Sequence, residues 1–224
     1  DVESRGLGDV YKRQHIHIID AELMGKGEKE KKDLYIEGVQ NNGIINHYEY
    51  IINSEGTIEI RHVLKPEGKM PLWFPRIGLT LTVSDALDQV KWYGRGPQEN
   101  YPDRKTGYPM GIYASTVQAM YEPYLMPQDY GLRTDVRWLQ LTTDKGIGLQ
   151  FKMNEWFNFN IYPYSTDNLT KAMYTYQLQK QKGMTLNLDY ATTGVGCTAR
   201  GVFGAYKAMP QEYRRTISIR PMMK

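Results

Sequence analysis

Short runs of apolar, β-branched and aromatic residues recur along most of the chain, separated by glycine, asparagine and aspartate. In residues 57–64 the apolar side chains fall mostly on alternate positions, which buries one face of a strand and leaves Glu59 and Arg61 to water. This pattern is typical of antiparallel strands that follow one another along the chain. We predict strands at residues 44–52, 57–64, 77–83, 89–93, 135–143, 147–153, 157–162, 185–190 and 214–220.

Turn residues join several of these runs. Residues 41–43 and 54–56 supply asparagine, serine and glycine, which suit the positive φ of tight hairpins, and residues 144–146 predict a further hairpin. Helical periodicity is weak, and the best short helix lies near residues 166–170. The sequence therefore predicts an all-β fold.

Residues 94–133 have a different texture, with five prolines and few alternating apolar positions. Since proline removes a donor from a β ladder, we predict a long proline-rich loop here. A loop of about 40 residues is unusually long, and such loops are commonly functional or form irregular covers.

Length and charge limit the kinds of partner. A chain of 224 residues suits one large all-β domain, and its 28 basic and 25 acidic residues are scattered without a basic stripe. No apolar run approaches the roughly 20 residues of a membrane helix, and we see no signal segment. We therefore expect neither nucleic acid nor a membrane as partner. The single Cys197 excludes an internal disulfide, so a cytoplasmic and a periplasmic location both stay open.

The first residues do not resemble the rest of the chain. Residues 4–14, SRGLGDVYKRQ, look like a translated sequencing-adapter scar. We predict that residues 1–14 are non-native, that residues 15–224 form one domain, and that the natural protein extends further toward its N-terminus.

Four ordered blocks resemble the C-terminal small-chain domain (domain 5) of glycoside hydrolase family 2 β-galactosidases. The longest is WYGRGPQENYPDR at residues 92–104. The others contain GLR at residues 131–133, FNFNI at residues 157–161, and LNLD followed by GVG between residues 186 and 196. The resemblance covers roughly residues 76–220, and more loosely residues 15–75.

This resemblance implies a supersandwich, in which two large antiparallel sheets pack face to face as in galactose mutarotases. It also implies that the catalytic glutamates lie on a separate upstream barrel, so that the isolated chain is an inactive hydrolase fragment. We expect a non-catalytic domain that contributes to sugar binding, to the active-site wall and to assembly. Its expected partners are a galactoside or related glycan, the upstream barrel of the same natural chain, and copies of itself in a homo-oligomer.

The resemblance also suggests sugar-binding candidates. Family members carry a tryptophan after the GVG motif, whereas this chain has Arg200 and Phe203 in that stretch. The guanidinium of Arg200 suits a carboxylate or sulfate on an acidic glycan, although a surface salt bridge is an alternative. Tyr174 stands where some members place a histidine, and it can equally be a tyrosine of the sheet face.

Tryptophan and carboxylate side chains give the remaining candidates. The chain has 18 tyrosines and 4 tryptophans against 5 phenylalanines, which suits both half-buried sheet faces and sugars. Trp138 and Trp156 are candidates for sugar contact, with a place in the core as the alternative. Glu99 and Asp103 form the best-placed carboxyl pair, but we expect Glu99 to accept backbone hydrogen bonds and Asp103 to pair with Arg104 or Arg95.

Two other functions stay open. One is a free carbohydrate-binding or mutarotase-like module, and the other is an independent epimerase or lyase. Mutarotases use a histidine acid and a glutamate base, but His47 and His62 lie in predicted strands, where a solvated or core-edge role is expected. One cysteine and dispersed histidines predict no metal site, and no cofactor is expected.

Overall fold

The computed structural model describes residues 43–197 and 201–223. The segment predicted to be non-native, residues 1–14, lies outside these ranges, as does the candidate residue Arg200. Within the described ranges, no helix has the length and apolar character that crossing a bilayer requires.

The described chain is nearly all β-structure, which confirms the predicted fold class. The strands are β1 Gly43–Ile52, β2 Ile58–Glu67, β3 Arg76–Val83, β4 Gln89–Arg95, β5 Met110–Thr116, β6 Arg133–Thr142, β7 Gly148–Tyr162, β8 Met184–Thr192 and β9 Tyr213–Met222. The short helical elements are η1 Gln118–Met120, α2 Thr166–Lys171, η2 Thr175–Gln177 and η3 Gly204–Tyr206.

Most predicted elements are present, with two corrections. The predicted strands at residues 147–153 and 157–162 are the two halves of the single strand β7. The predicted loop at residues 94–133 contains β5, which pairs only with β4. As an edge strand, β5 needs little apolar alternation, and for that reason the sequence pattern did not reveal it. The predicted helix near residues 166–170 is confirmed as α2, whose N-cap is Ser165.

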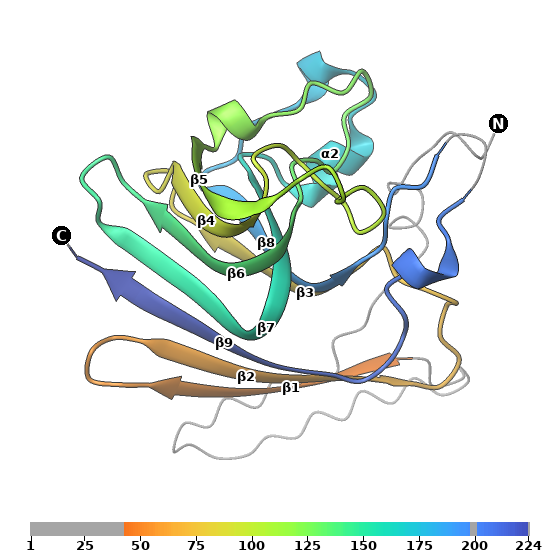
Figure 1. The fold of residues 1–224 in the computed structure, drawn as a ribbon, viewed down its shortest axis with the longest axis horizontal. Helices are drawn as coiled ribbons and strands as arrows, with labels where there is room; N and C mark the ends of the chain where they lie inside the picture. The colour runs from red at the N-terminus through yellow and green to blue at the C-terminus, as the bar shows by residue number, and fades with distance from the viewer. Residues whose placement is uncertain (1–42, 198–200, 224) are drawn as a thin grey trace.

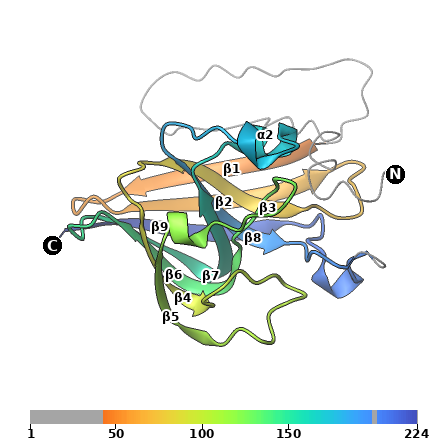
Figure 2. The ribbon, with the colours of Figure 1, turned by 90° about the horizontal axis from the view of Figure 1, so that it is seen from above.

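The strands form one branched antiparallel sheet that curls on itself. Its main path runs β1-β2-β9-β7-β6-β4-β5, while β8 pairs with β7 and β3 pairs with β8. Figure 1 shows β1 and β2 in a layer below β4, β5 and β6, and Figure 2, from above, also separates β1 from β5. This two-layer arrangement is compatible with the expected supersandwich, although the layers are joined through β7 and β9.

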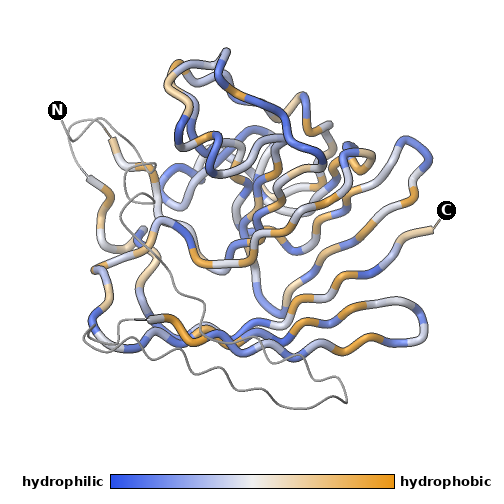
Figure 3. The backbone as a smooth tube through the Cα atoms, turned by 180° about the vertical axis from the view of Figure 1, so that it is seen from behind, coloured by the Kyte–Doolittle hydropathy of each residue, from blue (hydrophilic) through white to orange (hydrophobic). Residues whose placement is uncertain are grey.

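One apolar core fills the space between the layers. Ile60 of β2 and Trp92 of β4 belong to the same cluster of buried side chains, together with Phe151 and Phe159 of β7. Figure 3 shows apolar and polar positions alternating along the lower strands, as expected for a sheet with one buried face. Because the core spans both layers, the curl of the sheet is held by hydrophobic burial.

A smaller cluster of tyrosines holds α2 against the sheet. Tyr130, Tyr162 and Leu169 are its buried members, and the rings of Tyr130 and Tyr162 lie 5.4 Å apart. Part of the high tyrosine content therefore serves packing.

Candidate functional site

The sheet forks at the middle of β7. Residues 148–153 of this strand pair with β9, whereas residues 158–162 pair with β8. Residues 154–156 pair with neither strand, and the register with β6 shifts next to them, at Val136. The strands β8 and β9 thus diverge from β7, which both of them pair with. Between them, residues 154–156 of β7 have no ladder partner in either strand.

Two asparagines of β7 replace the missing ladder bonds at this fork. The Oδ1 of Asn154 accepts the backbone N–H of Thr216 in β9 at 3.0 Å. Asn158 accepts the backbone N–H of Asp135 in β6 at 3.3 Å and donates to the hydroxyl of Thr192 in β8 at 3.2 Å. These side chains supply partners to backbone and side-chain groups that the ladder leaves open at the fork.

A cleft of about 540 Å³ lies at the fork. Its walls come from the middle of β7, from residues 190–192 at the end of β8, from Arg215 of β9, and from residues 205–208 in the connection between β8 and β9. Lys105 and Asp135 contribute to the remaining lining. We call this the fork cleft; its volume suits a ligand of about one or two sugar units.

Asp135 is held as a carboxylate in the cleft wall. Arg95 donates to its Oδ2 at 2.6 Å, and the Lys105 ammonium lies 3.0 Å from both oxygens. Burial alone would raise the pKa of Asp135, but the hydrogen bonds from Arg95 and Lys105 outweigh it and hold the pKa below the ordinary 3.8. Its φ of 56° is unusual for a residue other than glycine and coincides with the β6 register shift.

A second ion pair lies on the β9 side of the cleft. Arg215 contacts Glu155 at 2.9 Å, and the exposed fractions of their side chains are 13% and 58%. The Arg215 guanidinium also lies 5.7 Å from the ring centre of Tyr190. Both carboxylates that line the cleft are therefore paired with basic side chains.

Behind Tyr190 lies a buried histidine. The Nδ1 of His62 is 2.7 Å from the Tyr190 hydroxyl, and its Nε2 is 2.9 Å from Oδ1 of Asn46. Because a carbonyl oxygen only accepts, Nε2 carries the proton and Nδ1 accepts from the tyrosine. Burial lowers the pKa of His62 to about 4. His62 is thus a neutral core residue, in agreement with the structural role expected of it.

Trp156 presents one face of its indole ring at the cleft. The side chain is 60% exposed, and the guanidinium of Arg137 lies 3.4 Å from the ring centre. Since Arg137 covers one face, the opposite face is the one available for stacking. An exposed indole face beside amide and charged side chains is a combination that suits a sugar, whose C–H face is apolar and whose rim carries hydroxyls.

The GVG motif is hydrogen-bonded to the proline-rich loop, a contact that the sequence did not indicate. Asp103 accepts the backbone N–H groups of Val195 at 3.1 Å and Gly196 at 2.7 Å. Arg104 donates to the carbonyl oxygen of Gly196 at 2.6 Å. The expected pairing of Asp103 with Arg104 or Arg95 is therefore wrong, because backbone N–H groups take the carboxylate and Arg95 pairs with Asp135. Both side chains anchor the segment that leads toward residues 198–200.

Glu99 has the structural role that the sequence predicted. It accepts the backbone N–H of Gly131 at 2.8 Å and the hydroxyl of Tyr101 at 3.0 Å, and it also accepts from the hydroxyl of Tyr124. Its oxygens are engaged by protein donors, and it does not line the fork cleft.

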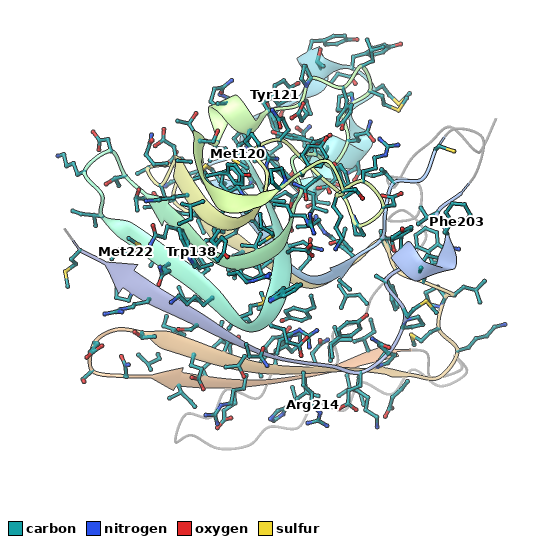
Figure 4. The ribbon with its side chains drawn as sticks, in the orientation of Figure 1. Met120, Tyr121, Trp138, Phe203, Arg214 and Met222 are labelled. Atoms are coloured by element: carbon teal, nitrogen blue, oxygen red, sulfur yellow. The ribbon has the colours of Figure 1, made fainter. Side chains whose placement is uncertain are left out.

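The structure brings only part of the aromatic candidates together. Trp156 lines the cleft, and Phe203, 65% exposed, directly precedes η3 in the connection that forms one wall. Trp138 lies well apart from Phe203 (Figure 4), on the outer sheet face, with its ring 6.4 Å from that of Tyr93. Tyr174 stacks on Tyr176 beside η2 and is no part of the cleft lining.

The sequence did not predict several of the residues that line the cleft. Lys105, Asp135, Asn154, Lys207 and Arg215 carry no local pattern that marks them. Asn158 stands in the FNFNI block, so its motif was a usable signal. Within the part of the chain that the structure describes, no three histidine, cysteine, aspartate or glutamate side chains gather as a metal site would require.

Comparisons with known proteins agree with the motif blocks. A family model described as the β-galactosidase small chain matches residues 8–219. Similar curated proteins include β-galactosidases of Priestia megaterium, 38% identical over 147 residues, and Vibrio cholerae, 39% identical over 122 residues. The alignments cover 66% and 54% of this chain but only 14% and 11% of those relatives, so the chain spans about one seventh of their length or less.

Proposed function

Because the chain belongs to the β-galactosidase small-chain family, we propose that it is a non-catalytic C-terminal domain of a β-galactosidase-like glycoside hydrolase. In this proposal the fork cleft contributes to sugar binding and to a wall of the active site, and the catalytic barrel lies upstream in the same natural chain. Assembly of the full enzyme, including a homo-oligomer, is part of the same proposal.

The observation that carries this proposal is the exposed indole face of Trp156 in a preformed cleft. The ring is fixed by Arg137, 3.4 Å from its centre, and by its place at the fork of β7. A ring that is already held in position loses little conformational entropy when a sugar stacks on it. Such a platform supports a binding role.

The carboxylates of the cleft support the non-catalytic part of the proposal. Retaining glycosidases need a carboxylic acid with a raised pKa near a second carboxylate. In the fork cleft, Asp135 has a lowered pKa and Glu155 is paired with Arg215. Asp135 is therefore not suited to protonate a leaving group at neutral pH, and Glu155 is held in an ion pair.

The anchored GVG segment supports the active-site wall. Asp103 and Arg104 fix its backbone, and the chain then continues through residues 198–200 to Phe203 and the cleft wall at η3. A backbone segment that is held by such hydrogen bonds can present side chains to a neighbouring domain with little loss of entropy.

Hydrolysis of a chromogenic β-galactoside tests the proposal. We expect no turnover by the 224-residue chain and turnover by the natural full-length protein. In that protein, Trp156→Ala should lower kcat/KM by about tenfold, the value of one good aromatic contact, whereas Tyr176→Ala, an exposed tyrosine outside the cleft, should leave it unchanged.

Two results would contradict the proposal. Turnover by the 224-residue chain alone would mean that it holds a catalytic site. An unchanged kcat/KM in the Trp156→Ala full-length enzyme would mean that the fork cleft contributes no sugar binding to the active site.

A further inference from the structure

The charges around the fork cleft do not balance. Asp135 is shared by two cations, Arg95 and Lys105, and Glu155 is taken by Arg215. Two carboxylates thus pair with three basic side chains, which leaves one positive charge in excess. A cleft with an excess of one sign concentrates its field on any ligand that enters.

Two further cations increase this excess. Among the residues that the structure describes, Lys207 pairs with no carboxylate; it lines the cleft, and its ammonium lies 5.6 Å from the ring centre of Trp73. Arg137 likewise pairs with no described carboxylate: it donates to the carbonyl oxygen of Asp135 at 2.9 Å and lies over Trp156. Neither charge is used up by an ion pair of the described chain.

Lys207 belongs to the same cleft lining as the proposed sugar platform, whereas Arg137 lies behind that platform and outside the lining. Arg137 covers the far face of the Trp156 ring, and Lys207 belongs to the opposing connection between β8 and β9. A sugar on the free face of Trp156 would therefore lie in a cleft whose unpaired charge is positive. Neutral sugars gain little from such charge, but an anionic substituent gains charge-assisted hydrogen bonds.

We propose that the fork cleft recognises a sugar that carries a carboxylate or a sulfate, with the ring on the free face of Trp156 and the anion held by Lys207. This inference rests on the proposed sugar-binding role of the cleft and adds the substrate class.

The test is a titration of the 15N-labelled 224-residue chain with three methyl β-D-galactosides: the neutral sugar, the galacturonide and the 6-sulfate. The indole N–H signal of Trp156, identified by its loss in Trp156→Phe, reports binding. We expect the anionic sugars to bind about tenfold more tightly than the neutral sugar at low salt, and the difference to shrink at high salt. A gain for only one of them identifies the anion as carboxylate or as sulfate.

Matched variants assign the effect to the cleft. Lys207→Gln should bring the affinity for the anionic sugars down toward that of the neutral sugar. Lys145→Gln removes the same charge from the exposed turn between β6 and β7 and should change nothing.

Failure of this inference differs from failure of the proposed function. Equal affinity for neutral and anionic sugars would overturn the anionic specificity and leave the sugar platform in place. A preference that survives Lys207→Gln would also overturn it. If no sugar shifts the Trp156 signal, the cleft is no sugar site of this chain, and the inference falls together with the sugar-binding part of the proposed function.

Discussion

The carboxylate of Asp103 occupies the space that a side chain at Gly194 would need. A Cβ atom built on Gly194 would lie 2.4 Å from Cγ of Asp103 and 2.5 Å from its Oδ1. The same carboxylate accepts the N–H groups of the next two residues, Val195 and Gly196. The glycine that opens the GVG motif is therefore required by a residue about 90 positions earlier in the chain.

Replacing Gly194 should loosen this anchor. In Gly194→Ala the methyl group must displace the Asp103 carboxylate, which breaks or strains two hydrogen bonds. We expect a loss of about 1–3 kcal/mol in the free energy of unfolding, measured by urea denaturation. Gly107→Ala is the matched control, because nothing lies within 4 Å of a Cβ there. Equal stability of the two variants would show that Asp103 can move at little cost.

Removing the charge of Glu99 should weaken the proline-rich loop. Glu99 accepts from Gly131, Tyr101 and Tyr124. In Glu99→Gln one acceptor oxygen becomes an NH2 group, so at least one donor loses its charged partner, with an expected cost of about 1–2 kcal/mol. Glu55→Gln, at an exposed turn, serves as control. A Glu99→Gln protein as stable as this control would contradict the anchoring role.

Stability should fall on mild acidification because of His62. Its pKa is about 4 in the folded protein and about 6.5 when unfolded, so between these values the unfolded state binds more protons. The contribution of His62 is complete above pH 6.5, falls as the pH decreases toward 4, and amounts to roughly 3 kcal/mol. An NMR titration of the His62 ring checks this directly. A midpoint near pH 6.5 in the folded protein would contradict it.

The buried pair between Arg76 and Asp189 should be costly to break. Arg76 contacts Asp189 at 2.6 Å and Asp129 at 3.3 Å, and the Asp189 side chain is only 2% exposed. Burial raises the pKa of Asp189, an effect that Arg76 opposes. Asp189→Ala leaves positive charge in the interior, so we expect a loss of about 3–5 kcal/mol in thermal or urea unfolding.

Asp129→Asn is the control for that experiment. Its carboxylate is 21% exposed and lies farther from Arg76, so water can take over part of its role. A loss at Asp129 as large as that at Asp189 would mean that depth of burial does not set the cost.

The sequence by itself determined the strands and the family. Alternation of apolar residues located eight of the nine described strands, since burial on one face imposes a period of two on each of them. The edge strand β5 was missed because it has one neighbour and little need for alternation. The motif blocks identified the family without any knowledge of contacts.

Local pattern also indicated one residue of the cleft lining, Trp156, but only as one of several aromatic candidates. Trp138 had the same standing in the sequence, although it lies on the outer face of the sheet beside Tyr93. Both residues are tryptophans, so the residue type does not distinguish them. Their different surroundings arise from the fork of β7, which is a relation among three strands.

Only the tertiary structure decided how the charges are distributed. Arg95, Lys105 and Asp135 are brought together across 40 positions, and Asp103 reaches Gly196 across more than 90. Sequence reasoning paired Asp103 with nearby arginines because short separations are the only ones it can weigh. Which charged side chains remain unpaired depends on every such long-range contact. The excess of positive charge at the fork cleft therefore follows from the folded chain and not from its nearly balanced composition.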